Sequence, residues 1–137
     1  MEDLIQLLHE NSYSLIVANG EVNTFTGRGV SDLYKILNED PGYLVGASIA
    51  DKIVGKAAAA LMIIGRIKEL YADVISIPAK KILIKNGIRV YYRTEVTHIV
   101  NRTGTGWCPL ETLCYELQDP QACFIRIQDF MNKKSNS

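Results

Sequence analysis

Apolar residues near the start of the chain recur first at helical spacing and then at strand spacing. Over residues 2–11 they fall on one helical face, namely Leu4, Ile5, Leu7 and Leu8. Two extended segments, 13–18 and 21–26, flank Asn19-Gly20. Both central positions of a type I′ turn need positive φ, which an Asn-Gly pair tolerates. The pattern therefore predicts a short helix followed by a β-hairpin.

Small and apolar residues dominate the middle of the chain. We expect Ser31 to cap a short helix that ends near Leu37. Residues 49–67 follow as a segment rich in small and apolar residues, with Gly55 and four alanines at 57–60. We interpret this run as one long central helix, because small side chains let a helix lie close against a sheet.

The second half of the chain alternates between strand-like and helix-like segments. The predicted elements are a strand at 72–77, a helix at 79–85, a strand at 88–92 with an extended segment at 97–100, helices at 109–117 and 120–131, and a frayed tail at 132–137. Strands alternating with helices after a hairpin indicate an α/β fold. We expect a three-layer α/β/α arrangement with a mixed sheet, in one domain over residues 1–137.

Composition and charge narrow the classes of partner. The chain of 137 residues is 47% hydrophobic and carries 15 basic and 15 acidic side chains, so its formal net charge is zero. This balance gives no broad attraction to nucleic acid or to a membrane surface, and we expect neither as a partner. The acidic N-terminus does not resemble a signal peptide, and the apolar run at 54–67 is too short to span a bilayer. We therefore expect a cytoplasmic location.

Cysteine and histidine usage argues against a disulfide framework and against a metal site. Three cysteines are an odd number, no Cys-x-x-Cys pair is present, and the two histidines lie far apart in the sequence. Gly27-Arg-Gly29 and Gly104-Thr-Gly106 are fragments of phosphate-binding loops without a full motif. We expect no metal and no organic cofactor.

The first candidate site is the predicted helix start around Asp51. Ser48 and Asp51 have the spacing of a capping box, which alone explains the aspartate. Alternatively Asp51 is a proton carrier in a ligand site, with Ser48 beside it and with Lys52 and Lys56, one helical turn apart, holding an anionic group. Solvated lysines are the simpler interpretation of this pair.

The second candidate site is the helix start at Pro109, a residue suited to the first helical position. Cys108 then lies at the cap and Glu111 three residues further on, after the loop that ends at Gly106. A thiol at a helix N-terminus can have a lowered pKa and raised reactivity. A buried, inert cysteine is the alternative at position 108, and packing is the expected role of Cys114 and Cys123.

The order of elements, with two helix starts that present short polar motifs, resembles the cytidine-deaminase-like superfamily. In its zinc-containing members the first motif is His or Cys, Ala and Glu, the second is Pro-Cys-x-x-Cys, and the metal sits between the two helix starts. The run Ala50–Ala59 together with Cys108-Pro-Leu-Glu111 is more closely similar to an uncharacterised bacterial family on this fold, a domain of unknown function. The resemblance implies the cytidine-deaminase-like fold.

The departures from the superfamily motifs decide what the resemblance implies about activity. Ile49 stands at the first zinc-ligand position, Asp51 replaces the catalytic glutamate and Glu111 replaces the second cysteine, so only Cys108 keeps a ligand type. A catalytic zinc requires three protein ligands and an open position. We therefore expect no zinc-dependent deamination.

Three functions remain open from the sequence, and whether the protein is an enzyme is not decided. The preferred one is a pocket between the starts of helices 49–67 and 109–117 that binds a small polar or anionic molecule, nucleoside- or nucleotide-like in character. Its candidate catalytic residues are Asp51, Cys108 and Glu111, and its candidate ligand-binding residues are Ser48, Lys52, Lys56 and Gly106.

The alternatives are a cysteine-dependent enzyme with Cys108 as nucleophile and a structural or assembly protein with a degenerate site. In the assembly protein, the apolar side of the last helix, formed by Phe124, Ile127 and Phe130, would pack against a partner. A homodimer is the expected form of that association.

Overall fold

The computed structural model describes residues 1–27, 30–100, 106 and 108–136. Its elements follow one another as α1 (Glu2–Glu10), β1 (Leu15–Asn19), β2 (Glu21–Phe25), α2 (Ser31–Glu39), β3 (Ser48–Val54), α3 (Lys56–Gly65), β4 (Glu69–Ser76), α4 (Ile77–Lys85), β5 (Arg89–Val96), α5 (Pro109–Cys114) and α6 (Pro120–Asn136). The protein is therefore an α/β protein, as the alternating pattern predicts.

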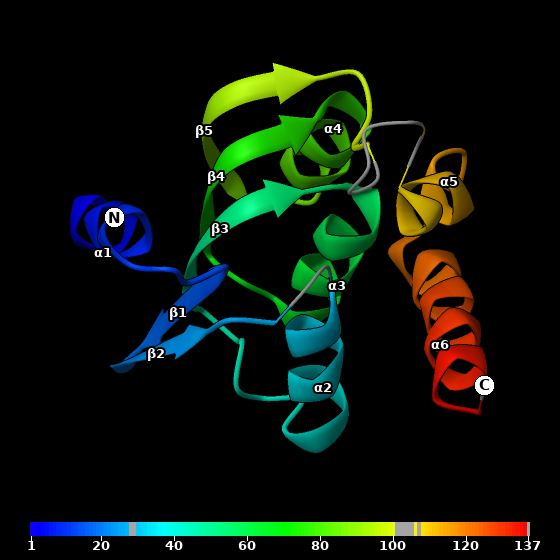
Figure 1. Cartoon of the computed structure of the whole chain (residues 1–137), viewed down its shortest axis with the longest axis horizontal. Helices are drawn as coiled ribbons and strands as arrows, with labels where there is room; N and C mark the ends of the chain where they lie inside the picture. Colours follow the sequence, from blue (N-terminus) through cyan, green and yellow to red (C-terminus); the bar gives the residue numbers. More distant parts are fainter. Residues whose placement is uncertain (28–29, 101–105, 107, 137) are drawn as a thin grey trace.

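A five-stranded mixed sheet in the order β2-β1-β3-β4-β5 organises the fold. Strand β1 is antiparallel to both β2 and β3, whereas β3, β4 and β5 are parallel. Parallel neighbours need a crossover, and α3 and α4 supply the two crossovers here. In Figure 1, α1 covers one face of the sheet and α2, α3 and α4 cover the other, with α5 and α6 outside α3. Helices thus flank the sheet on both sides.

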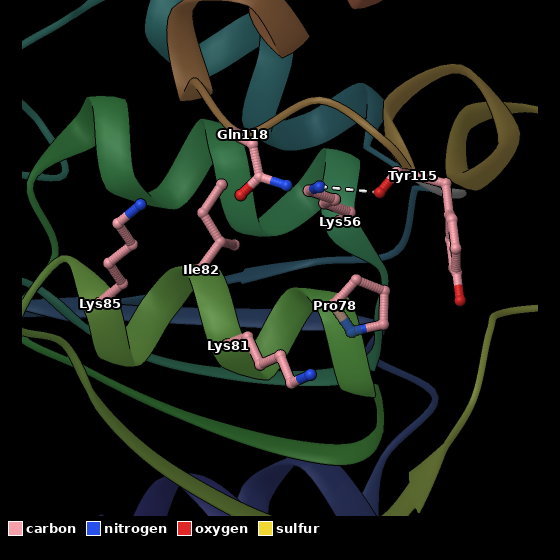
Figure 2. Close-up of a pocket in the computed structure, with 7 residues that line it drawn as sticks. All are labelled: Lys56, Pro78, Lys81, Ile82, Lys85, Tyr115 and Gln118. Atoms are coloured by element: carbon pink, nitrogen blue, oxygen red, sulfur yellow. Dashed lines mark hydrogen bonds between the residues drawn. The ribbon is translucent and has the colours of Figure 1, made fainter.

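Helix α3 is the central packed helix of the larger core. All four of its alanines, 57–60, are buried, and α6 packs on it from outside. A Cβ at Gly65 would lie 2.8 Å from Leu44 Cδ1, so the end of the helix also touches its neighbours closely. At its start, the Nζ of Lys56 donates a hydrogen bond to the carbonyl oxygen of Tyr115 at 2.8 Å, which fastens the end of α5 to α3 (Figure 2).

The prediction of one helix over residues 49–67 is wrong, because its first part is strand β3. Ile49, Ala50 and Val54 are buried, and the strand lies between β1 and β4 in the interior of the sheet. A strand covered on both faces is continuously apolar, so its periodicity does not distinguish it from a buried helix. The predicted capping box is therefore wrong as well, since Ser48 and Asp51 lie within a strand.

Two turn and cap predictions also differ from the structure. The hairpin is confirmed, but Asn19 pairs with Glu21 across Gly20, which has φ +82°. Among the described residues, Arg66 is the only one other than glycine with positive φ, so a type I′ turn is wrong. Ser31 is the first residue of α2, whose N-cap is Val30, and so does not cap the helix.

In the C-terminal part of the chain, helix α5 is shorter and helix α6 is longer than the sequence predicts. Helix α5 ends at Cys114, three residues earlier than predicted, while α6 continues to Asn136 in place of the frayed tail predicted from residue 132. Strand β5 extends to Val96, and residues 97–99 belong to no strand.

The apolar side of the last helix is used within the chain. Ile127 is fully buried in the larger core, and Phe124 and Phe130 pack against that core. Phe124 also contacts the ring of Tyr34 on α2, with centroids 6.0 Å apart. Ile127 is thus not available to a partner, while packing of the partly buried Phe124 and Phe130 against a second molecule stays a prediction. In the described part of the chain, no helix combines the length and apolarity needed to cross a bilayer.

Candidate ligand-binding site

A cavity of about 650 Å³ lies where helices α2, α3 and α5 begin, beyond the carboxyl end of β3. In α/β sheets this edge is where ligands ordinarily bind, because helix starts converge there. Apolar side chains form much of the wall, among them Leu15, Val30, Ile99, Leu110 and Phe130. The charged or reactive side chains that line it are Asp32, Asp51, Lys52, Cys108 and Glu111.

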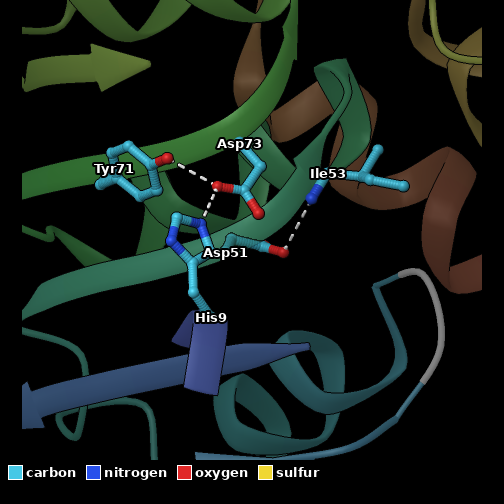
Figure 3. A network of polar contacts seen from close by, with 5 residues as sticks. All are labelled: His9, Asp51, Ile53, Tyr71 and Asp73. Carbon is cyan, nitrogen blue, oxygen red and sulfur yellow. Dashed lines mark hydrogen bonds and ion pairs between the residues drawn. The ribbon is translucent and has the colours of Figure 1, made fainter. Parts of the chain in front are cut away.

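Asp51 lies in the middle of the sheet, opposite Leu15 of β1 and Ala72 of β4. Its Oδ1 accepts a hydrogen bond from the backbone N–H of Ile53 at 3.3 Å (Figure 3). Burial raises the pKa of this carboxyl to about 8, although backbone hydrogen bonds from Ile53 and Lys52 oppose the shift. At neutral pH Asp51 is therefore mainly a neutral acid, which can donate as well as accept a hydrogen bond.

A second polar network lies beside Asp51 and joins α1 to the sheet. The Nε2 of His9 and the hydroxyl of Tyr71 each lie 2.6 Å from Asp73 Oδ1 (Figure 3). Burial, followed by the hydrogen bond to Asp73, raises the pKa of Tyr71 to about 12. The negative charge of Asp73 in turn contributes to the raised pKa of Asp51. Asp73 thus adds to the effect of burial, which is the main cause of the raised pKa of Asp51.

Glu111 is only 1% exposed and has two differently placed carboxyl oxygens. Its Oε2 accepts a hydrogen bond from the backbone N–H of Lys56 at 2.9 Å, where α3 begins. Its Oε1 has no hydrogen-bond partner among the described residues. Burial raises the pKa of Glu111, while the Lys56 N–H and the Ser76 hydroxyl lower it. A buried acceptor without a partner is costly, so Oε1 is a hydrogen-bonding position that the described part of the protein leaves unfilled.

Gly55, the N-cap residue of α3, allows Glu111 to reach the helix start. A Cβ at this position would lie 2.1 Å from Glu111 Oε2 and 3.1 Å from Ile99 Cγ1. Only a glycine leaves room for the carboxyl. Sequence reasoning missed this role because it placed Gly55 inside a helix of small residues.

Asp32 is the other residue of the cavity that sequence reasoning missed. It lies in the first turn of α2, and its Oδ2 accepts a hydrogen bond from the backbone N–H of Gly27 at 2.8 Å. An acidic residue just after a presumed helix start was a usable signal. Nothing in the sequence, however, shows that this start faces the same cavity as β3.

Cys108 is the N-cap residue of α5 and is half-buried. Its backbone N–H donates to the carbonyl oxygen of Ile99 at 2.8 Å, and its carbonyl oxygen accepts from the N–H of Thr112. The two other cysteines, Cys114 and Cys123, are buried free thiols, and the Sγ of Cys114 lies 4.0 Å from the carbonyl oxygen of Cys123. Of the three thiols, Cys108 is the one that lines the cavity.

The structure brings together four of the seven candidate residues and separates the other three. Asp51, Lys52, Cys108 and Glu111 line one cavity. Ser48 lies at the other end of β3, where its hydroxyl donates to Glu69 Oε2 at 2.6 Å. Lys56 contributes its backbone N–H to Glu111, but its side chain lies elsewhere, and Gly106 is not among the described residues that line the cavity. No group of three or more His, Cys, Asp or Glu side chains in the described part of the chain is placed to hold a metal ion.

The fold and the cavity define an α/β protein with a mixed five-stranded sheet and, at its helix starts, a largely apolar pocket that carries three carboxyl groups. Residues 3–131 match the family model described as "TM1506: Domain of unknown function (DUF1893)". The chain therefore belongs to the DUF1893 family, in agreement with the predicted resemblance to a family of unknown function. Neither this match nor the structural comparison names the cytidine-deaminase-like superfamily.

A solved structure shares the fold. It is the crystal structure of a DUF1893 family protein (TM1506) from Thermotoga maritima, which matches with a TM-score of 0.86 and 24% sequence identity. The match covers 93% of this chain and 87% of that chain. No curated protein matches the chain.

Proposed function

We propose that this protein binds a small polar molecule in the cavity at the starts of α2, α3 and α5, through the carboxyl groups of Asp51 and Glu111. The molecule is nucleoside-like: a planar ring that carries amino or ring N–H donors. We further propose that the fold is cytidine-deaminase-like and that no zinc-dependent deamination takes place on it.

The observation that carries the proposal is the burial of two carboxyl groups in the lining of one cavity. Burial raises the pKa of Asp51 to about 8, and Glu111 has one buried oxygen without a partner among the described residues. Both groups suit a ligand that donates hydrogen bonds. The apolar walls suit a flat ring, and about 650 Å³ is within the range of small-molecule sites.

The charge of the cavity disfavours an anionic ligand. The N–H of Lys56 at the start of α3, where an anion would ordinarily bind, already donates to the protein's own Glu111. Asp32 adds a further carboxyl to the lining, and Lys52 is the single basic side chain among the described residues there. We therefore take the polar ligand, and not the anionic one, as the proposed occupant.

The position of the cavity supports the superfamily assignment. In the zinc deaminases the metal sits between two helix starts, and the cavity here also lies between helix starts. The residues at those starts are Ser31-Asp32 on α2, Gly55-Lys56 on α3 and Cys108-Pro109 on α5. Cys108 is the one residue there that keeps a zinc-ligand type of the superfamily motifs, and a catalytic zinc requires three protein ligands, which supports binding without zinc-dependent chemistry.

The test is a thermal-shift and calorimetric screen of nucleosides, their monophosphates and small inorganic anions, because a ligand of the native state raises the melting temperature. We expect one or more nucleosides to stabilise the protein and the matched monophosphates to do so less. Asp51→Leu, which keeps the approximate volume and removes both oxygens, should lose this stabilisation, whereas Asp129→Leu, the same change at an exposed site on α6, should retain it. Stabilisation by anions alone, or equal binding by the Asp51→Leu variant, would contradict the proposal.

A second candidate function is thiol chemistry at Cys108. The observation that favours it is that the half-buried sulfur shares the cavity with Asp51 and Glu111, while the other two cysteines are buried. In this version Cys108 is the nucleophile and one of the two carboxyls carries the proton.

A further inference from the structure

A second, smaller cavity of about 160 Å³ lies between α3, α4 and the segment that joins α5 to α6 (Figure 2). Helix α4 contributes Pro78, Lys81, Ile82 and Lys85, whose spacing places them on one helical face. Tyr115 and Gln118 line it from the connecting segment, and Lys56 lines it from α3. Three of these side chains are lysines, and no carboxylate is among the described residues that line the cavity.

Lys56 is an unusual residue to find in this position, because it is only 4% exposed. A lysine is rarely buried without an acidic partner. Its Nζ donates to the carbonyl oxygen of Tyr115 at 2.8 Å, but an ammonium group has three donors. Within the described part of the chain, Lys56 forms no ion pair. Its charge is therefore held in the cavity wall without an anion in direct contact.

Lys81 and Lys85 of α4 also lack ion pairs among the described residues, although Lys80 on the same helix has one. Lys80 pairs with Glu95 and lies over the ring of Tyr92. Lys81 and Lys85 are exposed and line the cavity on the side of α4. The positive charges of Lys81 and Lys85 thus lie at the cavity without ion pairs among the described residues, whereas the charge of Lys80, outside the cavity, is paired with Glu95.

We propose that this cavity binds a small anion, a phosphate or carboxylate group carried by a small molecule. Lys56 provides a buried charge, Lys81 and Lys85 provide two exposed charges, and the amide of Gln118 provides a neutral donor. This site is separate from the proposed ligand cavity. Lys56 contributes its side chain to one cavity and its backbone N–H to Glu111 in the other.

The experiment is isothermal titration calorimetry of the full chain with inorganic phosphate and, in a second arm, with acetate, each titration being carried out at constant ionic strength and repeated at a higher chloride concentration. We expect saturable one-to-one binding of at least one of the two anions, weakening as salt is raised. Lys81→Gln/Lys85→Gln should lower the affinity by about tenfold or more, since two charge-assisted contacts are lost. Lys80→Gln removes a charge from the same helix outside the cavity and should leave the affinity unchanged.

The double variant changes only exposed side chains, so we expect it to fold like the wild type. Equal affinity in the double variant and the wild type, the same loss in Lys80→Gln, or the absence of saturable binding in both arms would each overturn the proposal. Asp51→Leu should leave anion binding unchanged, which separates this site from the proposed nucleoside-like site.

Discussion

The backbone of Gly55 and the carboxyl of Glu111 lie so close together that no side chain fits between them. A Cβ on Gly55 would be 2.1 Å from Glu111 Oε2. The same oxygen accepts the first N–H of α3, which joins the start of α5 to the start of α3 across 55 residues of sequence. This contact fixes the wall of the cavity in which Asp51 lies.

Gly55→Ala should destabilise the protein by about 1–3 kcal/mol, because the added methyl group overlaps the carboxyl and forces it away from the N–H of Lys56. The measurement is the free energy of unfolding from urea titration. Gly42→Ala is the matched control, since nothing lies within 4 Å of a Cβ there. In a Glu111→Ala background the cost of Gly55→Ala should shrink, and an unchanged cost would show that the contact is not its cause.

Asp51→Asn should reduce the dependence of stability on pH. Burial raises the pKa of Asp51 to about 8, above its value in the unfolded chain, so the native state binds the proton more tightly. The free energy of unfolding of the wild type therefore falls as pH rises from about 4 to 8, by at most about 1.4 kcal/mol per pH unit from this group. Asparagine is a neutral replacement of the same size and removes this slope.

The measurement for Asp51 is urea unfolding at pH 6, 7 and 8 of the wild type, Asp51→Asn and the exposed control Asp129→Asn. The Asp51 variant should gain stability relative to the wild type as pH rises, and the control should follow the wild type. Parallel curves for all three proteins would show that the Asp51 carboxyl is already ionised at pH 6.

The sequence predicts the class of fold better than it predicts the position of its elements. The hairpin around Gly20 and the alternation after residue 69 are local patterns, and both are present. The boundary between β3 and α3 is not local, because the apolar residues Ile49, Ala50 and Val54 are buried in an interior strand and resemble those of the buried helix that follows. Distinguishing such a strand from a helix requires knowledge of the strand order.

The candidate site shows the same limit. Asp51 and Glu111 were selected as residues at two helix starts, and they line one cavity, but Asp51 reaches it from a strand. Gly55 and Asp32 were missed because their roles depend on which helix starts face one another. Side chains 60 residues apart in sequence are brought together by the packing of α5 against the start of α3, next to the end of β3, and no spacing rule expresses that packing.

Glu111→Ala should cost about 2–4 kcal/mol of stability, because it leaves the N–H of Lys56 without its acceptor and opens a void in a site that is 1% exposed. Glu116→Ala, an equal change at an exposed position in the next turn, should stay within about 0.5 kcal/mol of the wild type. Thermal unfolding followed by circular dichroism measures both. Similar costs for the two variants would mean that the Glu111 carboxyl does not support α3.

Cys108 should be alkylated by iodoacetamide well before Cys114 and Cys123 in the native protein. It is half-buried in the wall of an open cavity, whereas the two other thiols are fully buried and require local opening of the structure to react. Peptide mass spectrometry over a time course measures each site, and labelling in urea supplies the control in which all three thiols are accessible. A nucleoside that binds beside Asp51 should slow the labelling of Cys108 without changing that of the other two. If the three thiols react at one common rate in native buffer, Cys108 is not accessible through the cavity, and the thiol chemistry considered for it loses its structural basis.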